Sequence, residues 1–264
     1  MNNTPNIQPR ILIVIPTLGE RLGYLRLALE SIRAQQPTAY DIVMVFPMQN
    51  EAAKKLADEF NAIQVDDPGT MSGALNVGIA KAEPWHEFIV WIGDDDLLLA
   101  NSLQTSMRAM DKNPSASVAF GYCDYINEDG KVIFSSRAGS LAPWIMTWGP
   151  DLVPMMGLMM RKKSLDEVGV FSVSLKWAMD LDMLLRLKRV GKFINTKQTL
   201  SAFRWHSTSQ TVTSRPRVLD ETEKIKRIYL PKYIRPFAIL WEVPVRIATK
   251  IAVHRVNHIT HQIK

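Results

Sequence analysis

The chain has little cysteine and no long apolar run. Cys123 is the single cysteine among 264 residues, so no disulfide can form within the chain and a reducing compartment is favoured. No segment reaches the about 18 consecutive apolar residues of a transmembrane helix, and residues 1–10 are polar without an apolar signal segment. We therefore expect a cytoplasmic protein, either soluble or peripheral on a membrane.

The main part of the chain also lacks excess positive charge. The net charge is +6, but residues 215–264 hold 11 Lys and Arg against 4 Asp and Glu, which leaves 21 basic and 22 acidic residues elsewhere. A nearly neutral body offers no basic groove for a polyanion, so we expect no nucleic acid as a partner. With 47% hydrophobic residues the chain can bury a full core.

Apolar runs alternate with helical spacing in the first hundred residues. The runs at 11–15, 42–46 and 88–92 are typical of strands buried on both faces, and a short strand is expected near 63–65. This alternation predicts an α/β fold, Rossmann-like, with a mostly parallel sheet and helices on both faces. Ligands bind outside the carboxyl ends of such strands, where four loops would meet: 17–21, 47–50, 66–73 and 93–96.

The expected strand at 88–92 is followed by Gly93 and then by three consecutive carboxylates, Asp94, Asp95 and Asp96. Neighbouring anions repel one another, and Mg²⁺ takes oxygen ligands while leaving positions for substrate phosphates. The cluster therefore favours a cation site. The alternative is a solvated acidic turn that caps the next helix through Asp96 or Asn101.

Residues 67–78 join a Pro68-Gly69 turn to the start of a helix that Ser72 could cap. The positive helix N-terminus would suit a diphosphate. Alternatively, Gly73 and Gly78 simply allow the helix to pack closely on the sheet. The segment is not a P-loop, because the Lys-Ser/Thr pair is missing.

An ordered set of motifs resembles the family 2 glycosyltransferases of the GT-A fold. The set covers roughly residues 10–212 and consists of the first strand ending at Pro16, Ala74–Ile79, Asp94–Asp96, Val168–Phe171, Ala178–Leu187 and Ser201–Ser209. The resemblance implies an N-terminal extension (1–9), a GT-A domain (10–214) and a basic helical tail (215–264). Within the domain, 10–100 would bind the nucleotide sugar and 101–214 the acceptor.

The activity implied by the resemblance is transfer of a sugar, with inversion, from a UDP-, GDP- or dTDP-linked donor to an acceptor hydroxyl. Mn²⁺ or Mg²⁺, held by Asp94, Asp96 and His206, would neutralise the leaving diphosphate. The residues implied to bind the nucleotide sugar are Pro16, Thr17, Glu20, Arg21, Gly73, Asn76, Asp94, Asp95 and Arg204, with Arg215 as a second candidate phosphate clamp.

One position departs from the family pattern. The family usually places acidic residues after the second strand, whereas this chain has Pro47-Met48-Gln49-Asn50. Gln49 or Asn50 would then replace a carboxylate by amide hydrogen bonds to the base.

Asp180 is the candidate general base. It opens a helix expected to end at Gly191, and a helix start stabilises a carboxylate as the anion, ready to accept the acceptor proton. The alternative is an ordinary N-cap. Where the family often has Glu, this chain has Met179, and Asp182 can either orient the site or pair with Arg186.

Segment 141–160 is rich in Met and Trp, which usually fill a core. Because aromatic faces stack on sugars, Trp144 and Trp148 are also acceptor candidates, together with Met179 and Asp182.

The tail mixes apolar and aromatic residues with Lys and Arg, and prolines at 231, 236 and 244 divide it. Basic amphipathic helices of this kind anchor proteins to membrane surfaces, here the inner face of the plasma membrane. Alternatively, the tail packs on its own domain or on a second subunit in a homodimer.

A membrane location would suit a glycan or lipid-linked acceptor in bacterial cell-surface polysaccharide synthesis (O-antigen, capsule or exopolysaccharide), as the resemblance implies. Two other functions remain open. A nucleotidyltransferase would attack phosphorus instead of the anomeric carbon, and a non-catalytic partner would only bind nucleotide or membrane.

Overall fold

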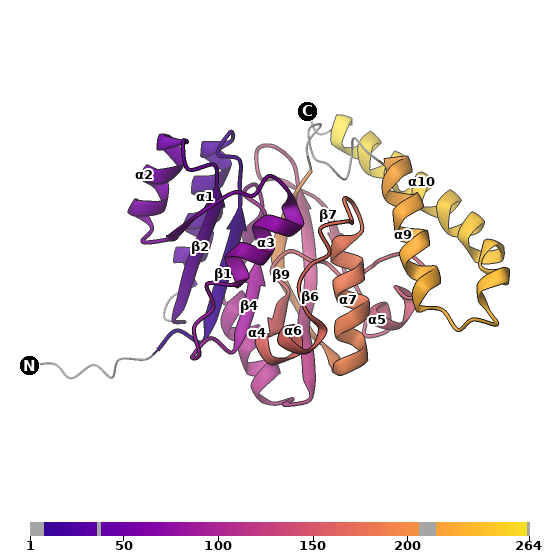
Figure 1. The fold of residues 1–264 in the computed structure, drawn as a ribbon. Helices are drawn as coiled ribbons and strands as arrows, with labels where there is room; N and C mark the ends of the chain where they lie inside the picture. Colours follow the sequence, from indigo (N-terminus) through magenta and orange to yellow (C-terminus); the bar gives the residue numbers. More distant parts are fainter. Residues whose placement is uncertain (1–7, 36–37, 206–214, 263–264) are drawn as a thin grey trace, which may run out of the picture.

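The strands form a single sheet in which most strands run in the same direction (Figure 1). The computed structural model describes residues 8–35, 38–205 and 215–262. The sheet order is β3-β2-β1-β4-β8-β6-β9-β5, with β7 beside β6. The strands are β1 Ile11–Pro16, β2 Tyr40–Phe46, β3 Ile63–Asp66, β4 Phe88–Trp91, β5 Leu97–Leu98, β6 Ala116–Ile126, β7 Val132–Ser136, β8 Met159–Arg161 and β9 Lys192–Arg204.

The pairing confirms the mostly parallel sheet. Strands β1 to β4 pair parallel with one another, and β6 pairs parallel with β9. Strand β8 joins the two groups and runs antiparallel to both β4 and β6. The carboxyl ends of β1 to β4 therefore meet at one edge, which we call the rim, and it carries loops 17–21, 47–50, 66–73 and 93–96.

Helices cover both faces of this sheet, as predicted. They are α1 Leu22–Arg33, α2 Glu51–Glu59, α3 Met71–Ile79, α4 Ser102–Asp111, α5 Ala142–Ile145, α6 Lys162–Val168, α7 Met179–Val190, α9 Arg215–Tyr229, the short 3₁₀ helix η1 Arg235–Phe237, and α10 Ile239–Gln262. Helices α1, α2 and α4 pack on one face, and α3, α6 and α7 pack on the other.

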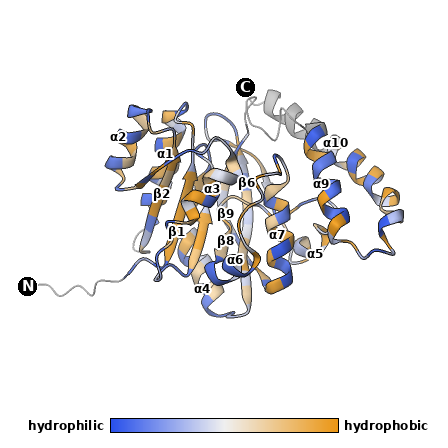
Figure 2. Ribbon diagram, in the orientation of Figure 1, coloured by the Kyte–Doolittle hydropathy of each residue, from blue (hydrophilic) through white to orange (hydrophobic). Residues whose placement is uncertain are grey.

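Alternation along the strands creates the two cores. In β1, Ile11 and Ile13 face the core under α1, whereas Leu12 and Val14 face the core under α3, and all four are fully buried. Figure 2 shows the central strands as a hydrophobic layer between helices of mixed polarity. A strand buried on both faces is apolar at every position, which explains the continuous runs in the sequence.

The second half supplies the rest of the sheet. Strands β6 and β7 form the hairpin expected around residues 127–130, and β9 ends at Arg204, beside the end of β6. The Met-rich segment is core, as its composition predicts: Met146, Met155, Met159 and Met160 are buried.

The first helix of the tail, α9, packs against the rest of the domain. Helix α9 packs on α7, and its Ile225 belongs to the same core as the α7 leucines. The first tail helix therefore packs on its own domain. Within the described part of the chain, no helix combines the length and apolar character required to cross a bilayer.

Gly78 provides a test of the packing of α3. A Cβ there would lie 2.4 Å from Val14 Cγ1 and 3.1 Å from Val45 Cγ2, whereas a Cβ on Gly23 in α1 meets nothing within 4 Å. We expect Gly78→Ala to lower the free energy of unfolding by about 1–3 kcal/mol through overpacking, and Gly23→Ala to leave it unchanged or raise it. Urea unfolding measures both, and equal stability of the two variants would contradict the packing.

Candidate functional site

The acidic loop after β4 is held in place by residues that follow β1. Thr17 Oγ1 donates to Asp94 Oδ2 at 2.6 Å, and Arg21 donates to Asp94 Oδ1 at 2.6 Å and to Asp95 Oδ2 at 2.7 Å. The Asp94 side chain is 9% exposed and that of Arg21 is 37% exposed. One guanidinium at the rim therefore neutralises part of the charge of the buried Asp94 and the partly buried Asp95.

Asp96 is held by β9, a strand in the second half of the sheet. Its Oδ1 accepts a hydrogen bond of 3.0 Å from the backbone N–H of Arg204, at the end of β9. The Arg204 guanidinium is buried and donates to the carbonyls of Asp95, Asn127 and Glu128. Arg204 thus ties the acidic loop to the β6–β7 turn, and its guanidinium bonds to the protein backbone instead of standing open as the predicted phosphate clamp.

Burial dominates the electrostatics of this loop. It raises the pKa of Asp94 in spite of the hydrogen bonds from Thr17 and Arg21. Burial, followed by repulsion from Asp95, raises the pKa of Asp96 well above its ordinary value. Three carboxylates face the two guanidinium groups of Arg21 and Arg204, so the loop favours additional positive charge.

Carboxylate oxygens of two residues lie close to Gly93. A Cβ on Gly93 would lie 2.8 Å from Asp96 Oδ2 and 3.0 Å from Asp95 Oδ1, so a larger residue would crowd both oxygens. Carboxylate oxygens suit Mg²⁺ or Mn²⁺. Among the described residues, no group of three or more His, Cys, Asp and Glu forms a metal site by itself, so other ligands would have to come from water or from a bound phosphate.

The start of α3 lies at the same rim. Thr70, not Ser72, is the N-cap, because its hydroxyl accepts from Gly73 N–H at 3.1 Å. A Cβ on Gly73 would lie 2.7 Å from that hydroxyl, which explains the glycine. Asn76 has a role other than donor binding: its amide exchanges two hydrogen bonds, of 2.9 and 2.8 Å, with the backbone of Phe171.

The start of α7 lies against the start of α3. The Ser72 hydroxyl lies 2.9 Å from Met179 Sδ, and both side chains are buried. Asp180 follows at once, and its Oδ1 accepts from Leu181 N–H at 2.7 Å. Because α3 begins at the rim, Asp180 opens on the same side of the sheet as the acidic loop.

Two expectations for α7 need correction, and the pairing of Asp182 with Arg186 is confirmed. Burial raises the pKa of Asp180, so the helix start does not dominate its titration, although a raised pKa suits a general base. Met179 is a core residue and not an acceptor contact. Asp182 accepts from Arg186, as its spacing predicts, and from Tyr229 Oη at 2.8 Å, so its oxygens hold helices together.

The sequence did not reveal Asp151 as a neighbour of Asp180, or Lys226 as a neighbour of Asp151. Asp151 is exposed in part to solvent, yet the surrounding protein and then repulsion by Asp180 raise its pKa to about 7, and Lys226 opposes the shift. Lys226 is buried, donates to the carbonyl of Gly149, and has its pKa lowered by burial. No local pattern connects a loop aspartate with a lysine of the tail.

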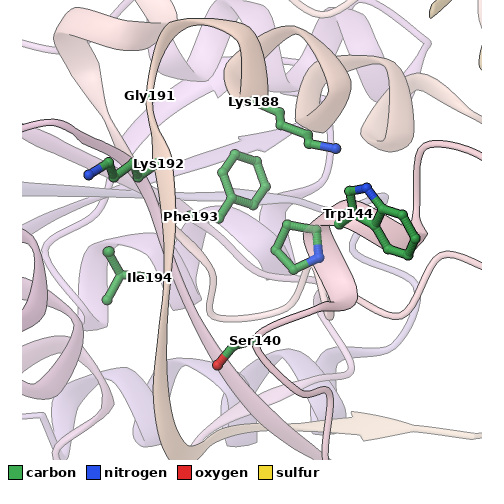
Figure 3. A pocket seen from close by; sticks show the side chains of 8 residues that line it. Ser140, Trp144, Lys188, Gly191, Lys192, Phe193 and Ile194 are labelled. Carbon is green, nitrogen blue, oxygen red and sulfur yellow. The ribbon is translucent and has the colours of Figure 1, made fainter. Parts of the chain in front are cut away.

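Trp144 lies at the opposite end of α7 from Asp180. It lines a hollow of about 340 Å³ with residues from the carboxyl end of α7 and the start of β9, including Lys188 and Phe193. Figure 3 shows these three side chains grouped on one side of β9. Asp180 is at the opposite end of α7, so the structure does not bring Trp144 to the base. Trp148 packs edge-on against Trp144 with ring centroids 4.6 Å apart.

The remaining candidates are scattered around the rim. Pro16 is buried at the end of β1, and Glu20 is exposed on the loop that follows. Asn50 caps α2 and donates to the carbonyls of Leu18 and Gly19, so its amide is occupied. His206 lies outside the described residues, and only the backbone of Arg215 is described.

Comparison with known proteins identifies relatives. A family model described as "Glycosyl transferase family 2" matches residues 12–175. An uncharacterized glycosyltransferase of Rickettsia felis is 24% identical over 216 residues, which are 75% of this chain and 35% of the relative. A second, from Rickettsia typhi, is 23% identical over 247 residues, which cover 88% of this chain and 75% of the relative. The chain thus spans about a third of the length of the first relative.

Solved structures agree on the fold. S. aureus TarS 1-349 in complex with UDP-GlcNAc superimposes with a TM-score of 0.65 at 14% identity, covering 86% of this chain and 69% of that chain. TarS 1-349 in complex with UDP gives a TM-score of 0.61 at 15% identity, and the superposition covers 86% of this chain and 68% of that chain. The chain therefore has the GT-A fold.

Asp151 offers a test of the electrostatics around Asp180. Its folded-state pKa of about 7 exceeds the roughly 3.9 of an unfolded chain, so the wild-type free energy of unfolding falls as pH rises through this window. Asp151→Asn cannot ionise. We expect its stability relative to wild type to be higher at pH 8 than at pH 5, as measured by urea unfolding, with the exposed Glu128→Gln as control. An equal difference at both pH values would contradict the assignment.

Proposed function

Since the chain belongs to glycosyl transferase family 2, we propose that it transfers a sugar, with inversion, from a nucleoside diphosphate sugar to an acceptor hydroxyl. One observation carries the proposal: the acidic loop 94–96 and Asp180 open on the same rim, and the N-terminus of α3 begins beside Asp180. A diphosphate and an attacking hydroxyl can thus be bound side by side.

The donor diphosphate has two sources of positive charge. The N-terminus of α3 offers its dipole, and the partly exposed guanidinium of Arg21 lies at the mouth of the acidic loop. Thr17 and Glu20 flank Arg21 on the loop that would contact the nucleoside. The TarS complexes with UDP-GlcNAc and UDP support a nucleotide sugar as the donor of this fold.

A divalent cation, Mn²⁺ or Mg²⁺, would complete the donor site. Asp96 Oδ2 and Asp95 Oδ1 lie close together beside Gly93, and Asp94 can join them if it gives up its hydrogen bonds to Thr17 or Arg21. The ion would neutralise the charge that develops on the leaving diphosphate. The three carboxylates would hold it in place.

Asp180 would accept the proton of the acceptor hydroxyl as that oxygen attacks the anomeric carbon. Its raised pKa brings it closer to neutral pH, where a general base works best. Attack from the side opposite the diphosphate inverts the anomeric centre in one displacement. A nucleotidyltransferase would instead attack phosphorus, whereas a glycosyltransferase releases free nucleoside diphosphate.

The C-terminal helices would bring the enzyme to a membrane. Helix α10 exposes an apolar stripe at a spacing of four residues, consisting of Ile239, Val243, Ile247 and Ile251, with Leu240 beside it. The nearby Lys232 and Arg235 are exposed, and Figure 2 shows hydrophobic positions along this helix. This combination suits an anionic lipid surface, and hence a lipid-linked glycan acceptor of bacterial surface polysaccharide.

Calorimetric titration of UDP-, GDP- and dTDP-linked sugars, each with and without Mn²⁺, tests the donor site. We expect one donor to bind only with Mn²⁺, and Asp96→Ala to lose that binding because a carboxylate ligand is gone. Asp180→Asn should bind the donor normally but release nucleoside diphosphate roughly 10²-fold more slowly, since it cannot accept a proton.

Two results would contradict this function. Full activity of Asp180→Asn would remove the base, and the absence of binding by any donor in wild type would favour a non-catalytic partner.

Membrane association can be tested without removing a helix. We expect the double variant Leu240→Glu/Ile247→Glu to lose sedimentation with vesicles of phosphatidylglycerol, because charge enters the apolar stripe. Leu27→Glu, on the exposed face of α1, should sediment like wild type. If the double variant sediments as well as the control, the stripe does not bind lipid.

A further inference from the structure

The segment that leads into α7 is bound by a residue from the tail. The Glu221 carboxylate, on α9, accepts hydrogen bonds from three successive backbone N–H groups: Lys176 at 3.2 Å, Trp177 at 2.5 Å and Ala178 at 2.7 Å. Two of these bonds share Oε2, and the third goes to Oε1. A single side chain therefore binds the whole segment that leads into Asp180.

Helix α7 has no side-chain cap of its own. Its N-cap residue is Ala178, which has no side-chain acceptor, and Asp180 directs its own carboxylate to Leu181 N–H. The N–H groups of residues 176–178 precede the helix and point toward Glu221, and a carboxylate near a helix N-terminus is also favoured by the helix dipole. Glu221 supplies that carboxylate from a position 43 residues after Ala178.

Further contacts fix α9 against the acceptor half. Tyr229, at the end of α9, donates to Asp182 at 2.8 Å, and Lys226 donates to the carbonyl of Gly149. Glu221 contacts the chain just before α7, and Tyr229 contacts its first turn. Because these bonds are spread over most of α9, the helix holds Glu221 in place.

We propose that Glu221 is a positioning residue for catalysis: it fixes residues 176–178, and thereby places Asp180 against the acceptor hydroxyl. This rests on the proposed function, because it assumes that Asp180 is the base. Helix α9 then contributes to the acceptor site. The hydrogen bonds of Glu221 to residues 176–178 orient Asp180, although Glu221 does not touch the substrate.

The same carboxylate acts on the titration of Asp180. The charged groups near Asp180 are Asp151, in the loop after α5, and Glu221, with Lys226 close to Asp151. Burial is the main reason why the pKa of Asp180 is raised, and the negative charge of Glu221 adds to it. Removing that charge lowers the pKa, so the acid limb of the activity profile moves to lower pH.

The test compares Glu221→Gln, Glu221→Asp and wild type, with Glu223→Gln as matched control. Glu223 is also on α9, but it pairs with Arg246 at 2.5 Å, away from α7. The first readout is hydrogen exchange of the amides at 176–178. The second is release of nucleoside diphosphate from the donor found by titration, measured as kcat, KM and pH profile.

We expect faster exchange at 176–178 in Glu221→Gln, because an amide group cannot accept all three hydrogen bonds. Its kcat should fall roughly 10- to 100-fold, its KM for the donor should stay unchanged, and its acid limb should move to lower pH. Glu221→Asp keeps the charge, so its acid limb should stay near that of wild type. The control should match wild type in every readout.

Unchanged exchange in Glu221→Gln would overturn the anchoring of residues 176–178 by Glu221. Faster exchange together with the kcat and acid limb of the control would overturn the catalytic role. If wild type releases no nucleoside diphosphate, the proposed function fails, whereas the exchange at 176–178 still decides whether Glu221 anchors this segment.

Discussion

The burial of adjacent carboxylates at the end of β4 is the constraint on which the site depends. Anions in a protein interior are stable only when donors or cations surround them. Thr17 and Arg21 meet this need from β1, and the backbone of Arg204 meets it from β9. The loop therefore fixes the relative position of the two halves of the sheet.

Much of the fold could be predicted because strands buried on both faces leave a strong local pattern. The continuous runs at β1, β2 and β4, the hairpin of β6 and β7, and the loops at one rim all follow from alternation and turn residues. The order of strands in the second half could not be predicted this way, since the insertion of β8 between β4 and β6 depends on long-range packing.

The site was predicted only in part, and for a physical reason. Asp94–Asp96 and Asp180 could be proposed because carboxylates at a strand end or helix start are conspicuous, and the structure places them on the same side of the sheet while their roles stay predictions. Arg204, Asn76 and Asp182 are equally polar, but they bond to the protein itself. Sequence alone does not distinguish a polar group that binds ligand from one that satisfies buried backbone. Glu221 shows the opposite case, because its partners lie 43 to 45 residues earlier.

The packing of α9 on α7 also has a consequence for how this chain can be divided. The family match ends at residue 175, and the next three residues donate to Glu221. A fragment that ended at that match would lack α7 altogether. A fragment that ended before α9 would keep α7 but would leave residues 176–178 without Glu221 and the core open at Ile225. A chimaera that exchanged α9 would therefore also exchange these contacts with the acceptor half.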